Sequence, residues 1–188
     1  MTRRLLLLEM LGIPCVVAMG TALHFVFAWS GYWTPIAVVA PVNESVWEHF
    51  KLAFWPGVFW ALVEYAAHRR DAWAFWSAKG YALCVAPILI AGLFYGYTAL
   101  LGRNILAIDI GTFVVGVVFA QFASAYLINA DIQTGRRRRV GIGLLLCQLT
   151  AYATFTFHPP ALGLFEDGRN GTKGIAVQPG ERYNLSSH

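Results

Sequence analysis

The sequence is poor in charged residues. Asp, Glu, Lys and Arg make up 13% of its 188 residues, whereas hydrophobic residues make up 57% and the mean hydropathy is +0.55. A soluble domain carries about 25% charged residues, so this composition excludes an ordinary soluble domain and predicts an integral membrane protein. At roughly 20 apolar residues per transmembrane helix, the chain is long enough for one bundle of about four to six helices.

Cysteines are few, and familiar catalytic patterns are missing. Cys15, Cys84 and Cys147 stand singly without CxxC or Cys/His spacing, so they predict no cysteine-based metal site. The GxSxG, HExxH, P-loop and Rossmann patterns are absent, as is any internal repeat. The net charge of +4 comes from short basic clusters between apolar runs, which membrane topology explains better than nucleic-acid binding does. We therefore expect membrane lipids, and no nucleic acid, as partners.

Five apolar runs predict an all-α polytopic bundle of about five transmembrane helices, at residues 5–29, 44–68, 76–101, 105–129 and 140–157. Pro56 falls inside the second run and removes a backbone hydrogen bond, so residues 44–55 could form a separate short helix. The chain then divides into a five-helix transmembrane domain, residues 1–160, and an outward polar tail, residues 161–188.

Basic residues predict the orientation of the bundle. Three basic clusters fall on one side of the membrane only if five helices span it. They are Arg3 with Arg4, residues 68–70 and residues 136–139. Lys and Arg concentrate in cytoplasmic loops. We therefore expect the N-terminus inside and the C-terminus outside.

Residues 43–51, Asn-Glu-Ser-Val-Trp-Glu-His-Phe-Lys, form an unusually polar segment at the outer end of the second predicted helix. Ionisable groups at membrane depth are expensive and usually mark a site or pair with one another. On a helix, Glu44, Glu48 and Lys51 would share one face, and His49 would point about 100 degrees away from Glu48. The predicted orientation brings His24 and Asp109 to the same outer end.

Two kinds of chemistry fit these side chains. Carboxylates and imidazoles from several helices are metal ligands, so a divalent metal ion is one candidate cofactor, with four candidate ligands: His24, Glu44, Glu48 and His49. Paired carboxylates can instead share a proton for acid–base catalysis. The candidate catalytic residues are Glu44, Glu48, His49 and Asp109. Asp109 would orient a histidine or complete the shell of ligands around the metal. The candidate substrate-binding residues are Asn43, Trp47, Lys51 and Asp167.

A purely structural interpretation competes with both. Ser45-x-x-Glu48 is a capping box, Asn43 is a good N-cap, and Glu48 with Lys51 is an ordinary ion pair. This interpretation leaves His24 and Asp109 unexplained.

Two further features lie outside this segment. Glu64 and His68 are i,i+4 neighbours, so we expect a local pair between them or contact with Lys79 and Arg69. The alternative is a second site or a proton path. Gly92 and Gly96 are spaced for close helix packing.

The string Pro-Val-Asn-Glu-Ser-Val-Trp-Glu-His at residues 41–49 resembles the signature of an uncharacterised family of small, mainly prokaryotic multi-pass membrane proteins, domain-of-unknown-function family 6512. The Leu23-His24-Phe25 step and residues 157–174 also resemble it. Other members often have Tyr at the position of His158, which leaves His24, Glu44, Glu48 and His49 as the better candidates. The resemblance implies architecture and site location, a prokaryotic inner-membrane location, and no activity.

The tail then gains a hypothetical role. Pro159-Pro160 stops the fifth helix, and an apolar run at residues 161–165 lies outside the lipid. The tail could fold back as a lid, with Phe165 packing down and Asp167 reaching the polar cluster.

The sequence leaves three functions open. The first is a membrane protein with an outward-facing Glu/His/Asp site for metal-dependent or acid–base chemistry on a lipid-derived or small substrate. The second is a small transporter with an ion or proton site, and the third is a non-catalytic subunit of a membrane complex. The sequence does not decide whether the chain is an enzyme, which substrate or metal it takes, or whether it forms homo-oligomers.

Overall fold

The computed structural model describes residues 3–67, 71–130 and 135–175. These residues form an all-α structure without a named strand, which confirms the predicted fold class. Its elements are α1 (Arg3–Trp29), η1 (Thr34–Val38), α2 (Val46–Ala67), α3 (Ala72–Leu101), α4 (Leu106–Ala130), α5 (Gly135–Phe157) and η2 (Gly163–Phe165).

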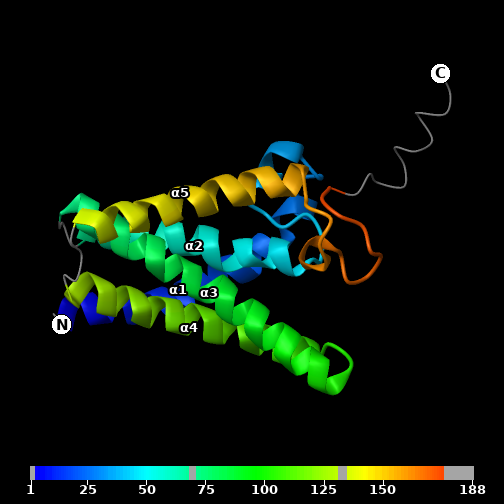
Figure 1. Cartoon of the computed structure of the whole chain (residues 1–188), viewed down its shortest axis with the longest axis horizontal. Coiled ribbons are helices and arrows are strands. Elements are labelled where there is room, and N and C mark those ends of the chain that lie inside the picture. Colours follow the sequence, from blue (N-terminus) through cyan, green and yellow to red (C-terminus); the bar gives the residue numbers. More distant parts are fainter. Residues whose placement is uncertain (1–2, 68–70, 131–134, 176–188) are drawn as a thin grey trace.

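The five α-helices form an elongated up-and-down bundle (Figure 1). Helix α2 packs against α1 and α3, and α3 also packs extensively against α4 and α5. One end of the bundle, here called the tail end, carries η1, η2 and residues 158–175. The opposite end, here called the basic end, carries the first turns of α1 and α5 with their arginines.

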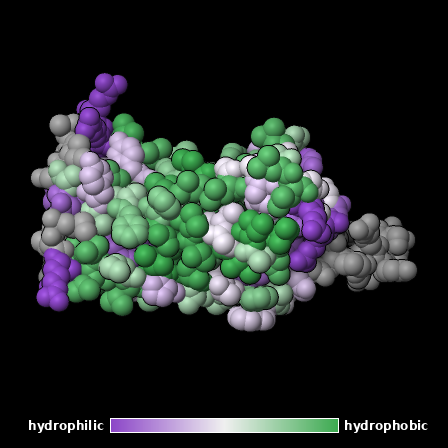
Figure 2. Space-filling view, turned by 90° about the horizontal axis from the view of Figure 1, so that it is seen from below, coloured by the Kyte–Doolittle hydropathy of each residue, from purple (hydrophilic) through white to green (hydrophobic). Residues whose placement is uncertain are grey.

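Four of the helices, α1, α3, α4 and α5, are long and apolar enough to cross a membrane. Helix α2 is not among them, because it carries Glu48, Lys51 and Glu64. All three of these side chains are buried inside the bundle. Figure 2 shows a broad hydrophobic band between two hydrophilic ends. The architecture is therefore that of a polytopic membrane helix bundle.

Helix α2 runs without interruption through Pro56, so the expected separate helix at residues 44–55 is wrong. Pro56 cannot donate a hydrogen bond to the Leu52 carbonyl one turn earlier. Gly20 of α1 packs closely against that carbonyl, because a Cβ at Gly20 would lie 2.4 Å from Leu52 O. The neighbouring helix thus covers the one carbonyl that the proline leaves free.

Close helix packing occurs at Gly80 and Gly141. A Cβ at Gly80 would lie 1.9 Å from the carbonyl oxygen of Gly141, so the backbones of α3 and α5 touch there. A Cβ at Gly92 or Gly96 would meet no atom of the described chain within 4 Å. The packing expected at Gly92 and Gly96 is therefore not made between the helices that the structure describes.

Candidate functional site

The polar segment begins as a loop and becomes helix only at Val46. Asn43 Oδ1 accepts a hydrogen bond from Ser45 N, and Ser45 Oγ accepts one from Glu48 N at 3.3 Å. These caps satisfy backbone donors at the start of α2 and hold Glu44 outside the helix. The prediction that Glu44 and Glu48 share a helical face is therefore wrong, and the two carboxylates point to different partners.

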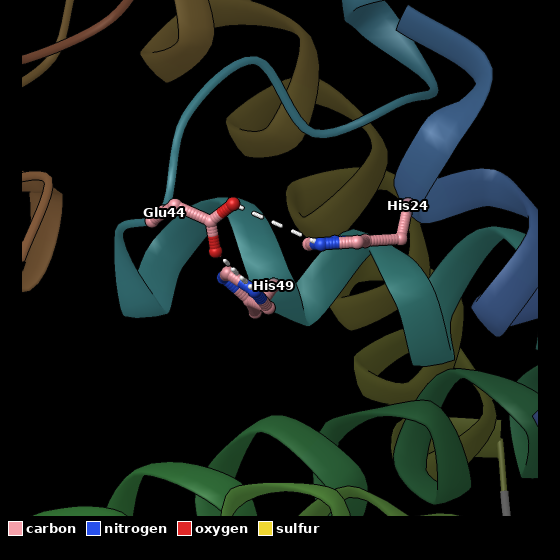
Figure 3. Close-up of side chains that lie close together, drawn as sticks. All are labelled: His24, Glu44 and His49. Atoms are coloured by element: carbon pink, nitrogen blue, oxygen red, sulfur yellow. Dashed lines mark ion pairs between the residues drawn. The ribbon is translucent and has the colours of Figure 1, made fainter. Parts of the chain in front are cut away.

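His24, Glu44 and His49 converge at the tail end, and Figure 3 shows the Glu44 carboxylate between the two imidazoles. Glu44 Oε1 lies 3.8 Å from His24 Nε2, and Glu44 Oε2 lies 3.4 Å from His49 Nε2. One potential ligand atom from each residue lies within 4.8 Å of the other two. The two rings come from different helices, α1 and α2, and their centroids are 5.3 Å apart.

A backbone contact orients the ring of His49. Its Nδ1 lies 2.8 Å from the carbonyl oxygen of Ser45, which can only accept, so Nδ1 carries a hydrogen. Nε2, the atom that faces Glu44, then donates to the carboxylate when the ring is protonated and carries the lone pair when the ring is neutral. This is the arrangement by which an outer partner fixes the tautomer of a metal-ligating histidine. His24 Nδ1 is buried and has no hydrogen-bond partner in the described chain.

The tail contributes a cation beside the carboxylate. Arg169 Nη2 lies 3.2 Å from Glu44 Oε1, and the arginine side chain is 73% exposed. The hydrogen bond with His49 lowers the pKa of the Glu44 carboxyl below its usual value of 4.5; burial opposes this, and the charges of His49, His24 and Arg169 add to it. Glu44 is therefore ionised at neutral pH and available as an anionic ligand.

Asp167 and Asn43 hold the loop against the tail. Asp167 Oδ2 accepts a hydrogen bond from Glu44 N at 3.1 Å, and its Oδ1 accepts one from Arg169 N at 2.7 Å. Asn43 Nδ2 donates to the carbonyl oxygen of Gly174 at 2.9 Å. Both side chains were predicted to bind substrate, and in the structure both position the backbone around Glu44.

Trp47 packs among aromatic rings. Its ring contacts Tyr152 and Phe155 of α5 and Phe165 of η2, with ring centroids 4.8 to 5.5 Å apart. Phe165 is buried, so the tail folds back onto the start of α2. Residues 176–188 of the predicted tail segment lie outside the described residues.

Glu48 and Lys51 form a separate buried pair that does not join the histidines. Lys51 Nζ lies 2.7 Å from Glu48 Oε2 and also donates to the Ala37 carbonyl at 2.7 Å. Thr156 Oγ1 of α5 lies 3.0 Å from Glu48 Oε1, and Val42 N donates to Glu48 Oε2. Glu48 therefore connects α2 to α5 and to the loop before α2, and Lys51 is fully buried and inaccessible to a substrate.

Asp109 is placed elsewhere. Its carboxylate accepts hydrogen bonds from Tyr97 and, at 3.4 Å, from Asn104, so it stabilises the turn between α3 and α4. It is not among the residues that contact His24, Glu44 or His49 in the described chain. The predicted convergence of α4 on the site is therefore not seen.

Several important residues were missed from the sequence. Arg169 and Thr156 gave no signal, because a tail arginine and a helical threonine are ordinary residues in those positions. Glu9 did carry a signal, as a lone carboxylate within the first apolar run. It pairs with Lys79, which also binds Glu64.

Comparison with known proteins gives one match. No curated protein and no solved structure matched the chain. The model of a family of unknown function, DUF6512, matches residues 4–175, which include all three converging residues and the part of the tail that contacts Glu44. The chain therefore belongs to the DUF6512 family.

Proposed function

We propose that this membrane protein binds a divalent transition-metal ion at its tail end through His24, Glu44 and His49. The observation that carries the proposal is the convergence of two imidazoles and one carboxylate from two segments of the chain, α1 and residues 43–51. Two histidines and one glutamate form a known donor set of catalytic zinc sites, in which the fourth position stays open for water or substrate.

The spacing supports the proposal. Zinc bonds of about 2.0–2.2 Å to nitrogen and oxygen place neighbouring ligands of a tetrahedron about 3.3–3.6 Å apart. The two nitrogen-to-oxygen distances to Glu44 are 3.4 and 3.8 Å. Each nitrogen faces a different Glu44 oxygen, and the three ligand atoms lie within 4.8 Å of one another, so the side chains must close in by about 1 Å to form the site. The Ser45 carbonyl already orients one of them.

The surroundings favour a substrate with an anionic group. The exposed guanidinium of Arg169 stands next to Glu44. Guanidinium groups bind phosphate and carboxylate oxygens well. A bound ion would supply Lewis acidity or an activated water, for which hydrolysis of a lipid-derived or small substrate is the simplest use. We extend the proposal to a prokaryotic inner membrane, with the tail end outside.

Zinc affinity of the purified protein in detergent tests the proposal. Competition between the protein and a chelator for Zn²⁺ should give a defined affinity, and Glu44→Gln and His49→Gln should weaken it at least about tenfold, the scale of outer-shell losses at metal sites. Asp109→Asn and Glu166→Gln are matched controls, since both remove a carboxylate away from the three converging residues. Equal losses in variants and controls, or no zinc binding by the wild type, would overturn the proposal.

A further inference from the structure

A second group of polar side chains lies inside the bundle, away from the histidines. Each of its members comes from a different helix: Glu9 from α1, Glu64 from α2, Lys79 from α3 and Ser124 from α4. None of the four is more than 2% exposed. We call these four residues the buried charge cluster.

Lys79 joins the two carboxylates. Its Nζ lies 3.2 Å from Glu9 Oε1 and also forms an ion pair with Glu64 Oε2. Ser124 Oγ donates to Glu9 Oε1 at 2.5 Å, and Trp60 Nε1 donates to Glu64 Oε1 at 3.1 Å. Each carboxyl group therefore accepts one hydrogen bond from a neutral donor, and both carboxyl groups contact the same ammonium.

The charges do not balance if every group is ionised. Two carboxylates and one ammonium leave one negative charge. Among the described residues, the other side chains that donate to the two carboxylates, Ser124 and Trp60, are neutral, and so is Gln121, which donates to the Glu9 backbone carbonyl. Lys79 is the cation seen in contact with either carboxylate in the described chain. An uncompensated charge in a low-dielectric interior is costly, and two carboxylates sharing a site avoid that cost by keeping a proton.

The unused hydrogen-bonding capacity indicates where that proton sits. Glu9 Oε2 is buried and has no hydrogen-bond partner in the described chain. The Glu9 and Glu64 carboxyl groups are held near each other, because both form an ion pair with the same Lys79 ammonium. Two ionised carboxylates that share one ammonium repel each other, whereas one proton on the pair removes this repulsion and turns a carboxyl oxygen into a hydrogen-bond donor.

We propose that Glu9 and Glu64 hold one proton between them at neutral pH, so that the buried charge cluster is an internal proton-binding site. The buried charge cluster shares no residue with the proposed metal site, so the two sites are separate. Its four residues lie on α1 to α4. Since each member lies on a different helix, uptake or loss of this proton changes the attraction among all four helices at once.

Infrared spectroscopy of the full chain in detergent tests the proposal. The wild type at neutral pH should show the C=O stretch of a protonated carboxylic acid, moved to lower frequency by D₂O. Glu9→Gln and Glu64→Gln should each abolish this band, because the remaining carboxylate is then balanced by Lys79. Glu166→Gln, which removes an exposed carboxylate paired with Lys173, should leave it unchanged.

Milder variants guard against misfolding. Glu9→Asp and Glu64→Asp keep both carboxyl groups and should retain the band at a shifted frequency. Lys79→Met removes the ammonium and should increase the band, since both carboxyl groups then take up a proton. The proposal would be overturned if the wild type lacked the band, as expected if a bound cation neutralises the cluster. It would also be overturned if none of these substitutions changed the band.

Discussion

Glu44 and Glu48 are four positions apart and have different partners. Glu48 is buried, and its charge is balanced by Lys51 and by hydrogen bonds from neighbouring segments. Glu44 is half-buried and lies between two imidazoles and a guanidinium. The carboxylate of Glu48 therefore stabilises the fold, whereas that of Glu44 is the one that we propose exchanges its partners for a metal ion.

Removing the buried ammonium should be far more damaging than removing an exposed one. Lys51→Met leaves Glu48 charged and unpaired in the interior, which typically costs about 3–5 kcal/mol of unfolding free energy. Lys173→Met breaks the exposed pair with Glu166 and should cost about 0–1 kcal/mol. Unfolding in detergent followed by circular dichroism measures both. Adding Glu48→Gln to Lys51→Met should recover much of the loss, and equal effects of the two single variants would refute the role of the buried pair.

Acid should weaken the contact between the loop and the tail in metal-free protein. The folded-state pKa of Glu44 is below its ordinary value of 4.5, so its ion pairs stabilise the fold above that value. The stabilisation is lost as the pH falls through the lowered pKa. Thermal unfolding with a chelator present should show wild type more stable than Glu44→Gln at neutral pH, with the difference shrinking in acid. A difference that does not shrink as the pH falls through the lowered pKa of Glu44 would contradict the assigned ion pairs.

Residue-level chemistry was only partly predictable. The ligand types and three of the four predicted metal ligands, His24, Glu44 and His49, do converge. Glu48 was misplaced because the helix begins at Val46 and not before Glu44. A shift of two residues in a helix start redirects a carboxylate. The sequence offered both Asn43 and Ser45 as caps, and the structure shows that the helix begins only after Ser45.

At the scale of the elements, hydrophobic runs predicted all five helices, with ends that differ from the observed ones by a few residues. The run predicted to start at residue 76 starts at Ala72, because Asp71 caps the helix by accepting from Trp73 N and Ala74 N. The pairing of helices was not predictable in this way. Glycine spacing indicated close packing at Gly92, whereas the close contact lies at Gly80.

Alanine at these two glycines should therefore have opposite effects. Gly80→Ala forces its Cβ into the backbone of α5, and overpacking of this kind typically costs about 1–3 kcal/mol. Gly92→Ala meets open space and should be neutral or stabilising by up to about 1 kcal/mol, through helix propensity. Unfolding of both variants under the same conditions distinguishes them. A stable Gly80→Ala protein would contradict the observed contact between α3 and α5.

For the whole molecule, the bundle combines a proposed metal-ligand set at the tail end with a charge cluster buried among four helices. The orientation of this arrangement in the membrane remains a prediction from the positions of arginines. A reporter fused after His188 should be active outside the cytoplasm, and one fused before Arg3 should be active inside it. Cytoplasmic activity of the C-terminal fusion would reverse the predicted sidedness.

X-ray absorption at the zinc edge of zinc-loaded protein tests the central claim most directly. The account predicts one zinc per chain, bound by nitrogen and oxygen atoms at about 2.0–2.2 Å, with scattering from two imidazole rings. His24→Gln should remove the scattering of one ring, whereas Asp109→Asn should leave the spectrum unchanged. A shell of water oxygens without imidazole scattering, or a spectrum that His24→Gln does not alter, would contradict the account.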